Sequence, residues 1–217
     1  MKTKIFSDQF AVDSRLEQFG LNRGIFHAVM EAAKMGFNMP TENFPNGSRG
    51  TLSWMMGTSQ IREELISIGG WDRDSLDNVS WVINHTLGMR IAILNADQSV
   101  CDEKNFPQPH SRKGAATESA TSSNQQLLSD ILDNSLNQNW SDSNSARWYF
   151  MVYCDGEEIR GELSLPTGFS NGYFTEYAER IFVGKYDGSR PGDKVRKISP
   201  DSGPDEFEIP VIRKKAV

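Results

Sequence analysis

The chain has 217 residues, of which 37% are hydrophobic and 10% aromatic, so it is long enough to bury one sizeable core. Its 23 basic and 29 acidic residues give a formal net charge of −6, which excludes a general polyanion-binding protein. Contact with nucleic acid would need a local basic patch. Two cysteines, Cys101 and Cys154, are too few for a disulfide framework, and the sequence leaves open whether they are joined.

The first ten residues lack the apolar core of a signal peptide. No apolar run approaches the roughly 20 residues that span a bilayer. We therefore expect no membrane partner, and a location in the cytoplasm of a prokaryotic cell or of a phage-infected host.

The first half of the chain predicts two helices separated by turns. Residues 1–20 read as an irregular or short-strand lead-in, and Asn22 is expected to cap a helix from Arg23 to about Met35. A turn-rich linker (39–50) and a short apolar strand (51–56) follow. A second helix is expected from Thr58 or Ser59 to the Gly69-Gly70 pair. The apolar residues of the first helix recur on one face: Ile25, Phe26, Val29, Met30 and Ala33.

The second half predicts strands joined by short turns. Residues 80–95 form a hairpin and lead into a long polar loop (102–123), after which Ser122 or Ser123 caps a third helix to about Leu132. Two strands (147–154 and 157–165) are joined by Asp155-Gly156, which favours a two-residue type I′ turn. Further strands are expected at 173–183 and 207–212, and residues 213–217 form a basic tail.

This pattern predicts one α+β domain spanning residues 1–217. We expect an antiparallel sheet of about five or six strands and two to three helices that come mainly from the first two-thirds of the chain. The helix that carries Phe26, Val29 and Met30 should pack on the sheet. The expected core residues of the sheet are Ile91, Ile93, Phe150, Val152, Leu163 and Leu165.

The polar loop supplies the candidate site. A strand ends at Asn95-Ala96-Asp97 and leads into Pro/Ser/Gly-rich sequence with His, Arg and Lys, whose donors suit a phosphate or a carboxylate. The alternative is a solvated, flexible segment. If these groups meet Arg62 in one concave pocket, the site is supported. The candidate ligand-binding residues are Arg62, Asn95, Asp97, His110, Ser111, Arg112 and Lys113.

Signatures of catalysis and of metal binding are missing from the sequence. The histidines and cysteines do not pair at metal-ligand spacing, and we predict no catalytic residue, metal or cofactor. Glu158 and Glu162 admit two interpretations, a Mg²⁺-dependent nuclease site or an ordinary exposed strand face shared with Arg160. Trp71, if exposed beside Arg62, is a candidate for stacking on a ligand ring.

Several segments together resemble a group of uncharacterised bacterial proteins associated with plasmids and other mobile elements. The resemblance covers roughly residues 49–183 and implies a prokaryotic mobile-element setting, with no activity attached. The segments are Thr58–Leu65, Gly70-Trp71, Asn95–Asp97, Pro109–Gly114, Asn124–Gln126, Glu158–Pro166 and Glu179–Ile181.

Two functional hypotheses follow. The first is a non-enzymatic binding or regulatory protein of a mobile element that acts through contacts with another protein. The second is a nucleic-acid or nucleotide-handling protein, with a metal-dependent nuclease as its enzymatic form. The acidic balance and the missing catalytic signatures favour the first.

Overall fold

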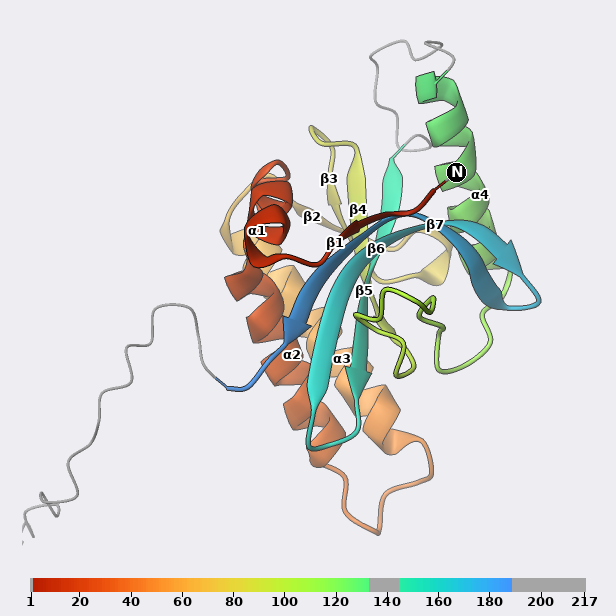
Figure 1. Cartoon of the computed structure of the whole chain (residues 1–217). Helices are drawn as coiled ribbons and strands as arrows, with labels where there is room; N and C mark the ends of the chain where they lie inside the picture. Colours follow the sequence, from red (N-terminus) through yellow and green to blue (C-terminus); the bar gives the residue numbers. More distant parts are fainter. Residues whose placement is uncertain (1, 133–144, 189–217) are drawn as a thin grey trace, which may run out of the picture.

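A computed structural model describes residues 2–132 and 145–188. This part of the chain holds four α-helices, one 3₁₀ helix and a seven-stranded sheet (Figure 1). The elements are β1 (Lys4–Phe6), α1 (Gln9–Glu17), α2 (Arg23–Asn38), α3 (Ser48–Ser67), β2 (Asp72–Asp74), η1 (Leu76–Asn78), β3 (Trp81–Asn84), β4 (Met89–Asn95), α4 (Ala115–Leu132), β5 (Ala146–Cys154), β6 (Ile159–Ser170) and β7 (Tyr173–Lys185).

The sheet is mixed, whereas the sequence predicts an antiparallel one. Its strand order is β1-β7-β6-β5-β4-β3-β2, and both the β1–β7 and the β4–β5 pairs are parallel. Strands β4 and β5 run in the same direction. A connection that contains α4 lies between them, and β5 starts beside the first residue of β4. The α+β class is confirmed. The predicted numbers of strands and helices and the predicted antiparallel pairing agree only roughly with the seven-stranded mixed sheet and four α-helices of the structure.

One face of the sheet packs against the N-terminal helices as the sequence predicts. Phe26, Val29 and Met30 of α2 are fully buried in one core cluster with residues of the sheet and of α1 and α3. The Asn22 side chain caps α2 by accepting from the Ile25 N–H. The predicted sheet residues of this core are all buried: Ile91, Ile93, Phe150, Val152, Leu163 and Leu165.

The predicted strand at 51–56 is wrong, because these residues belong to α3. That helix starts after Gly47, whose φ is 86°, and runs unbroken to Ser67. Its buried positions Gly57, Ile61 and Leu65 recur every four residues and face the core. A Cβ at Gly36 of α2 would lie 2.5 Å from the Leu52 carbonyl oxygen of α3, so this glycine lets the two helices approach closely.

The N-terminal segment is more regular than expected. It forms β1 and α1, and the Asp8 carboxylate caps α1 by accepting from the Ala11 N–H. Helix α4 starts at Ala115 rather than at Ser122, so it takes up the second half of the predicted loop. Its buried face is partly polar: Asn124 bonds the carbonyls of Arg147 and Pro166 and accepts from the Arg147 N–H. Because these polar residues give little apolar periodicity, the sequence pattern predicts a loop over the first part of α4.

The turn between β5 and β6 is longer than a type I′ hairpin turn. Residues 155–158 lie between the strands, and the Asp155 carboxylate accepts from the Glu157 and Glu158 N–H groups. Gly156 has a positive φ and Asp155 does not, whereas a type I′ turn needs both. The predicted strand at 207–212 and the basic tail at 213–217 lie outside the described residues.

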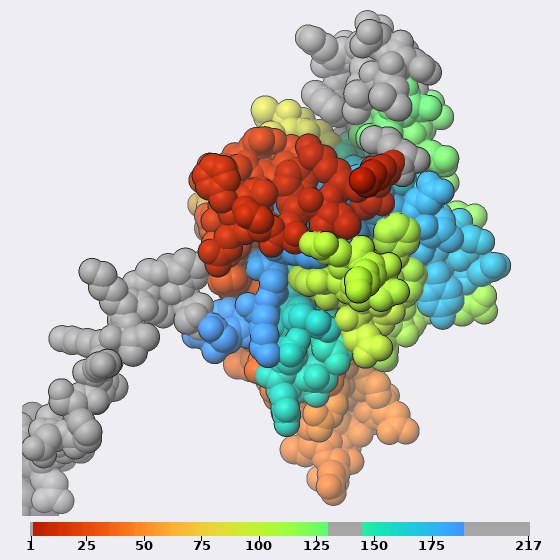
Figure 2. All heavy atoms as spheres, viewed as in Figure 1, coloured from red at the N-terminus to blue at the C-terminus, as the bar shows by residue number. Residues whose placement is uncertain are grey.

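Both faces of β6 are buried, which corrects the predicted exposed face. Glu162, for which an exposed strand face is one of the two interpretations, has no exposed surface, and neither has Ser164. The second face is covered by α4 and by the first part of the polar loop. In Figure 2 the yellow-green atoms of this loop lie between the red N-terminal segment and the blue and teal strands.

Candidate ligand-binding cleft

The site begins with a gap in the sheet beside β4. Strand β3 pairs with β4 only as far as Val82 and Ile91. The chain before β3 turns away, because Asp77 and Asn78 have positive φ and the Trp81 N–H bonds back to the Val79 carbonyl. Strand β4 therefore extends beyond its neighbour on this side.

The polar loop closes the far end of the gap. The His110 N–H donates to the Asn95 carbonyl at 2.9 Å, and Ala96 forms an antiparallel bridge with Pro109. Between these pairings the edge of β4 is open at Ile93. The Ala96 N–H points to β5, where it bonds Val152, so the alternation of a strand turns the N–H and C=O of Ile93 to the gap. Neither group has a backbone partner within the described ranges.

A cleft of about 520 Å³ occupies this gap. Its walls come from the start of α3, the segment before β3, the second half of β4, the polar loop, α4 and β5. The lining residues are Gly47, Gly50, Thr51, Trp54, Asn78, Val79, Ser80, Ala92, Ile93, Leu94, Asn95, His110, Ser111, Lys113, Thr117 and Tyr149. We call this space the β4 cleft.

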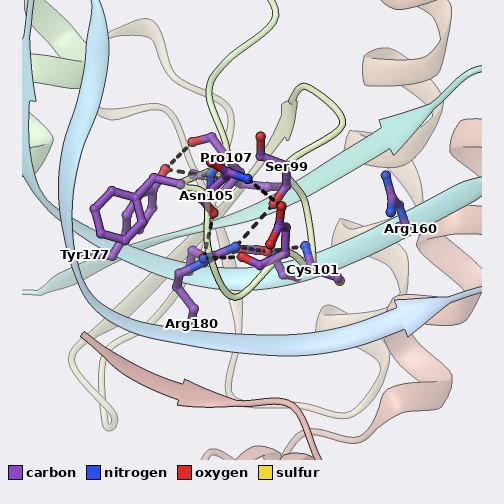
Figure 3. Close-up of polar contacts among 12 residues, drawn as sticks. Ser99, Cys101, Asn105, Pro107, Arg160, Tyr177 and Arg180 are labelled. Atoms are coloured by element: carbon purple, nitrogen blue, oxygen red, sulfur yellow. Dashed lines mark hydrogen bonds and ion pairs between the residues drawn. The ribbon is translucent and has the colours of Figure 1, made fainter. Parts of the chain in front are cut away.

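A buried ion pair holds the loop that forms one wall of the cleft (Figure 3). Arg180 of β7 and Glu162 of β6 lie 2.7 Å apart, and neither side chain is exposed. The Arg180 guanidinium also donates to the carbonyls of Ser99, Asp102 and Asn105.

Further hydrogen bonds fix the same loop. Glu162 accepts from the Cys101 N–H, the Tyr177 hydroxyl donates to the Pro107 carbonyl at 2.6 Å, and the Gln108 side chain bonds both backbone groups of Phe174. Residues 99–108 of the predicted solvated segment are thus anchored to the sheet. The carboxylate of Glu162, one candidate metal ligand, is engaged in this network.

Four of the seven predicted site residues meet in the β4 cleft. Asn95, His110, Ser111 and Lys113 all line it. The Asn95 amide donates to the Gly50 carbonyl at 2.7 Å, which ties the end of β4 to the start of α3.

The other three predicted residues lie elsewhere. The Asp97 carboxylate accepts from the N–H groups of Ser99 and Gln108 and shapes the loop. The Arg112 guanidinium donates to the Asn171 carbonyl at the β6–β7 turn. Arg62 contacts the carbonyls of Asp74 and Trp81 and lines a separate hollow with Arg73. Adjacent loop residues such as Arg112 and Lys113 point in different directions, and spacing alone does not reveal this.

The charged lining residue of the cleft is a cation, Lys113. Lys113 is half-buried, and burial lowers the pKa of its ammonium group. It lies just before the N-terminus of α4, where the helix dipole adds positive potential. No lining residue of the cleft is an Asp or Glu. This end of the cleft therefore favours an anion.

A buried tyrosine borders the same space. Tyr149 is 2% exposed, and within the described ranges its hydroxyl has no hydrogen-bond partner, although Thr117 lies beside it. Burial raises the pKa of Tyr149, so the group is a neutral donor at physiological pH. A buried polar group without a partner is costly, which makes Tyr149 a candidate contact for a ligand.

The sequence misses three lining residues of this kind. Trp54, Thr117 and Tyr149 read as core or loop residues, and only the tertiary structure brings them to Lys113. Trp54 is 39% exposed, whereas Trp71, the predicted stacking residue, is 4% exposed and belongs to the core. One feature of the sequence could have indicated Trp54 as a cleft residue: it follows closely after Gly47 and Gly50, which leave open space at the start of α3.

The cysteines and histidines supply no second site. Cys101 and Cys154 are free, and burial raises the pKa of the Cys101 thiol to about 12, which makes it a poor nucleophile. Among residues 2–132 and 145–188, no group of three His, Cys, Asp or Glu side chains is placed to hold a metal ion.

Comparisons with protein-family models, with curated proteins and with solved structures find no match to this chain. None of the described helices has the length and apolar character that a membrane crossing requires.

Proposed function

We propose that the chain is a non-enzymatic binding protein that takes a small anionic ligand in the β4 cleft. The observation that carries this is the half-buried Lys113 ammonium, which lies at the start of α4 in a cleft without a carboxylate. Charge-assisted hydrogen bonds to an anion would offset the burial of this cation. The resemblance to mobile-element proteins adds a prokaryotic mobile-element setting to the proposal.

The test compares two neighbouring cations. ¹⁵N-labelled protein is titrated with inorganic phosphate at about 50 mM salt, where charge interactions are weakly screened. We expect amide shifts at Lys113 and Thr117 that are lost in Lys113→Met and kept in Arg112→Met, since Arg112 bonds Asn171 outside the cleft. Shifts that are absent, or that persist in Lys113→Met, would overturn the proposal.

Contact with another protein is the second candidate, and one surface favours it. The end of the α2–α3 hairpin exposes large apolar side chains: Met35 is 57% exposed, Met39 52%, Phe44 44% and Met55 52%. Flexible methionines are common on surfaces that bind proteins. A Met39→Glu variant should keep the phosphate-induced shifts and lose association with the partner protein, measured with partner purified from the host.

Nucleic-acid handling gains less support from the arrangement. Glu158 is paired with Arg160 and Lys185, and Glu162 with Arg180, so both candidate carboxylates are engaged. A gel shift at about 50 mM salt, where phosphate contacts are strongest, tests this function. Binding there, with Mg²⁺-dependent cleavage, would replace our first proposal.

A further inference from the structure

The shape of the gap restricts what the β4 cleft can hold. At one end the edge of β4 is paired with Val82, and at the other Asn95 is bonded to His110. A polypeptide strand adding to this edge would need to run past both ends, which are closed. The gap therefore suits a compact ligand rather than a continuous peptide strand.

The open edge also specifies the chemistry of one part of the ligand. The N–H and C=O of Ile93 offer a donor and an acceptor in the plane of the sheet. A planar group that carries both an acceptor and a donor on its edge would complement them. Nucleobases and other amide-containing heterocycles have this property.

Aromatic side chains lie on both sides of this plane. Trp54 comes from α3, on the face packed by the N-terminal helices, and Tyr149 belongs to the cluster on the opposite face. Apolar atoms of Val79, Ala92 and Leu94 complete the walls. A flat ring in the gap would thus meet apolar and aromatic surface, which stabilises bases in protein sites.

The remaining part of the cleft suits a phosphate. Lys113, His110 and Ser111 offer donors from the loop, and the first N–H groups of α4 are close by. Thr117 and Tyr149 line the cleft from the α4 and β5 side. The volume of about 520 Å³ falls within the range of small-molecule sites.

From these features we infer that the ligand of the β4 cleft is a nucleoside monophosphate, with its base against Ile93 and its phosphate at Lys113. This inference rests on the proposed anion-binding function and names the class of its ligand. A carboxyl-terminal peptide is the rival occupant, because a chain end has an anion and an amide but no flat ring.

Calorimetry with the full chain tests the inference. The probes are AMP, GMP, CMP and UMP, with adenosine, ribose 5-phosphate, inorganic phosphate and a tripeptide with a free carboxyl end. We expect at least one monophosphate to bind about tenfold more tightly than ribose 5-phosphate or inorganic phosphate, a difference that calorimetry resolves. Lys113→Met should weaken that monophosphate about tenfold, and Arg112→Met should not.

A second variant blocks the gap without touching charge. Gly50 lines the cleft, and a Cβ built there meets only the Asn95 amide nitrogen, at an ordinary 3.5 Å, so Gly50→Leu should fold and fill the space. It should abolish binding of the monophosphate.

The outcomes separate the two proposals. If inorganic phosphate binds as tightly as every monophosphate, the inference fails and the anion-binding function stands. If the tripeptide binds and the nucleotides do not, or if nucleotide binding survives Gly50→Leu, the inference also fails. If no anion binds, both fail.

Discussion

Replacing Arg180 by methionine removes the cation of an ion pair that is buried on both sides. Arg180 and Glu162 are each 0% exposed, and the guanidinium donates to both carboxylate oxygens at 2.8 and 2.7 Å. It also supplies hydrogen bonds to three carbonyls of the loop at Ser99, Asp102 and Asn105. The variant would leave a buried carboxylate and three loop carbonyls without their donor.

The expected cost follows from that count of lost partners. Breaking a buried pair from one side destabilises a protein by about 3–5 kcal/mol, because the remaining charge has no compensation. Lys185→Met is the matched control: its partner Glu158 is shared with Arg160 near the surface, and the Lys185 side chain is 57% exposed. That loss should cost about 0–1 kcal/mol.

Urea denaturation followed by tryptophan fluorescence measures both variants. Amide hydrogen exchange should show in addition that residues 99–108 lose protection in Arg180→Met and retain it in Lys185→Met. A free energy of unfolding for Arg180→Met within about 1 kcal/mol of the wild type, like that of an exposed pair, would refute the role assigned to this pair.

Three further predictions concern the core, the cleft and its cation. Leu163→Ala should cost about 2–5 kcal/mol in urea denaturation, since Leu163 is fully buried against the N-terminal helices; an unchanged midpoint would show that it is not a core residue. Gly50→Leu should raise the free energy of unfolding by about 0.5–1 kcal/mol, since it replaces a helical glycine at a position where a Cβ makes only one ordinary contact, and a lower melting temperature would contradict the open space described beside it. Burial lowers the pKa of Lys113 in the folded state, so its charge costs stability below that pKa, and the cost disappears as the pH rises toward the ordinary lysine value. Lys113→Met should therefore be more stable than the wild type at neutral pH, with a gap in melting temperature that narrows at alkaline pH; a gap that widens there would be inconsistent with this account.

The β4 cleft shows how far the sequence leads toward the site. The polar cluster that follows a buried strand predicts a site at the end of β4, and in the structure Asn95, His110 and Lys113 line one cleft. It does not reveal that Arg112 bonds the β6–β7 turn, because the direction of a loop side chain depends on what lies across from it. Nor does it reveal that Arg62 of α3 bonds the Trp81 carbonyl and lines a neighbouring hollow instead of the cleft.

By itself the sequence determines the local elements and much of the core. The spacing of Phe26, Val29 and Met30 defines the buried face of α2, and the alternation around Leu163 places that residue in the core. These are short-range consequences of helix and strand periodicity. Only the tertiary structure decides the parallel pairing of β4 with β5, the burial of Glu162 and the open edge at Ile93. Each depends on which segments lie side by side, and residues far apart in the chain, such as Glu162 and Arg180 or Asn95 and His110, become partners only when the fold brings them together.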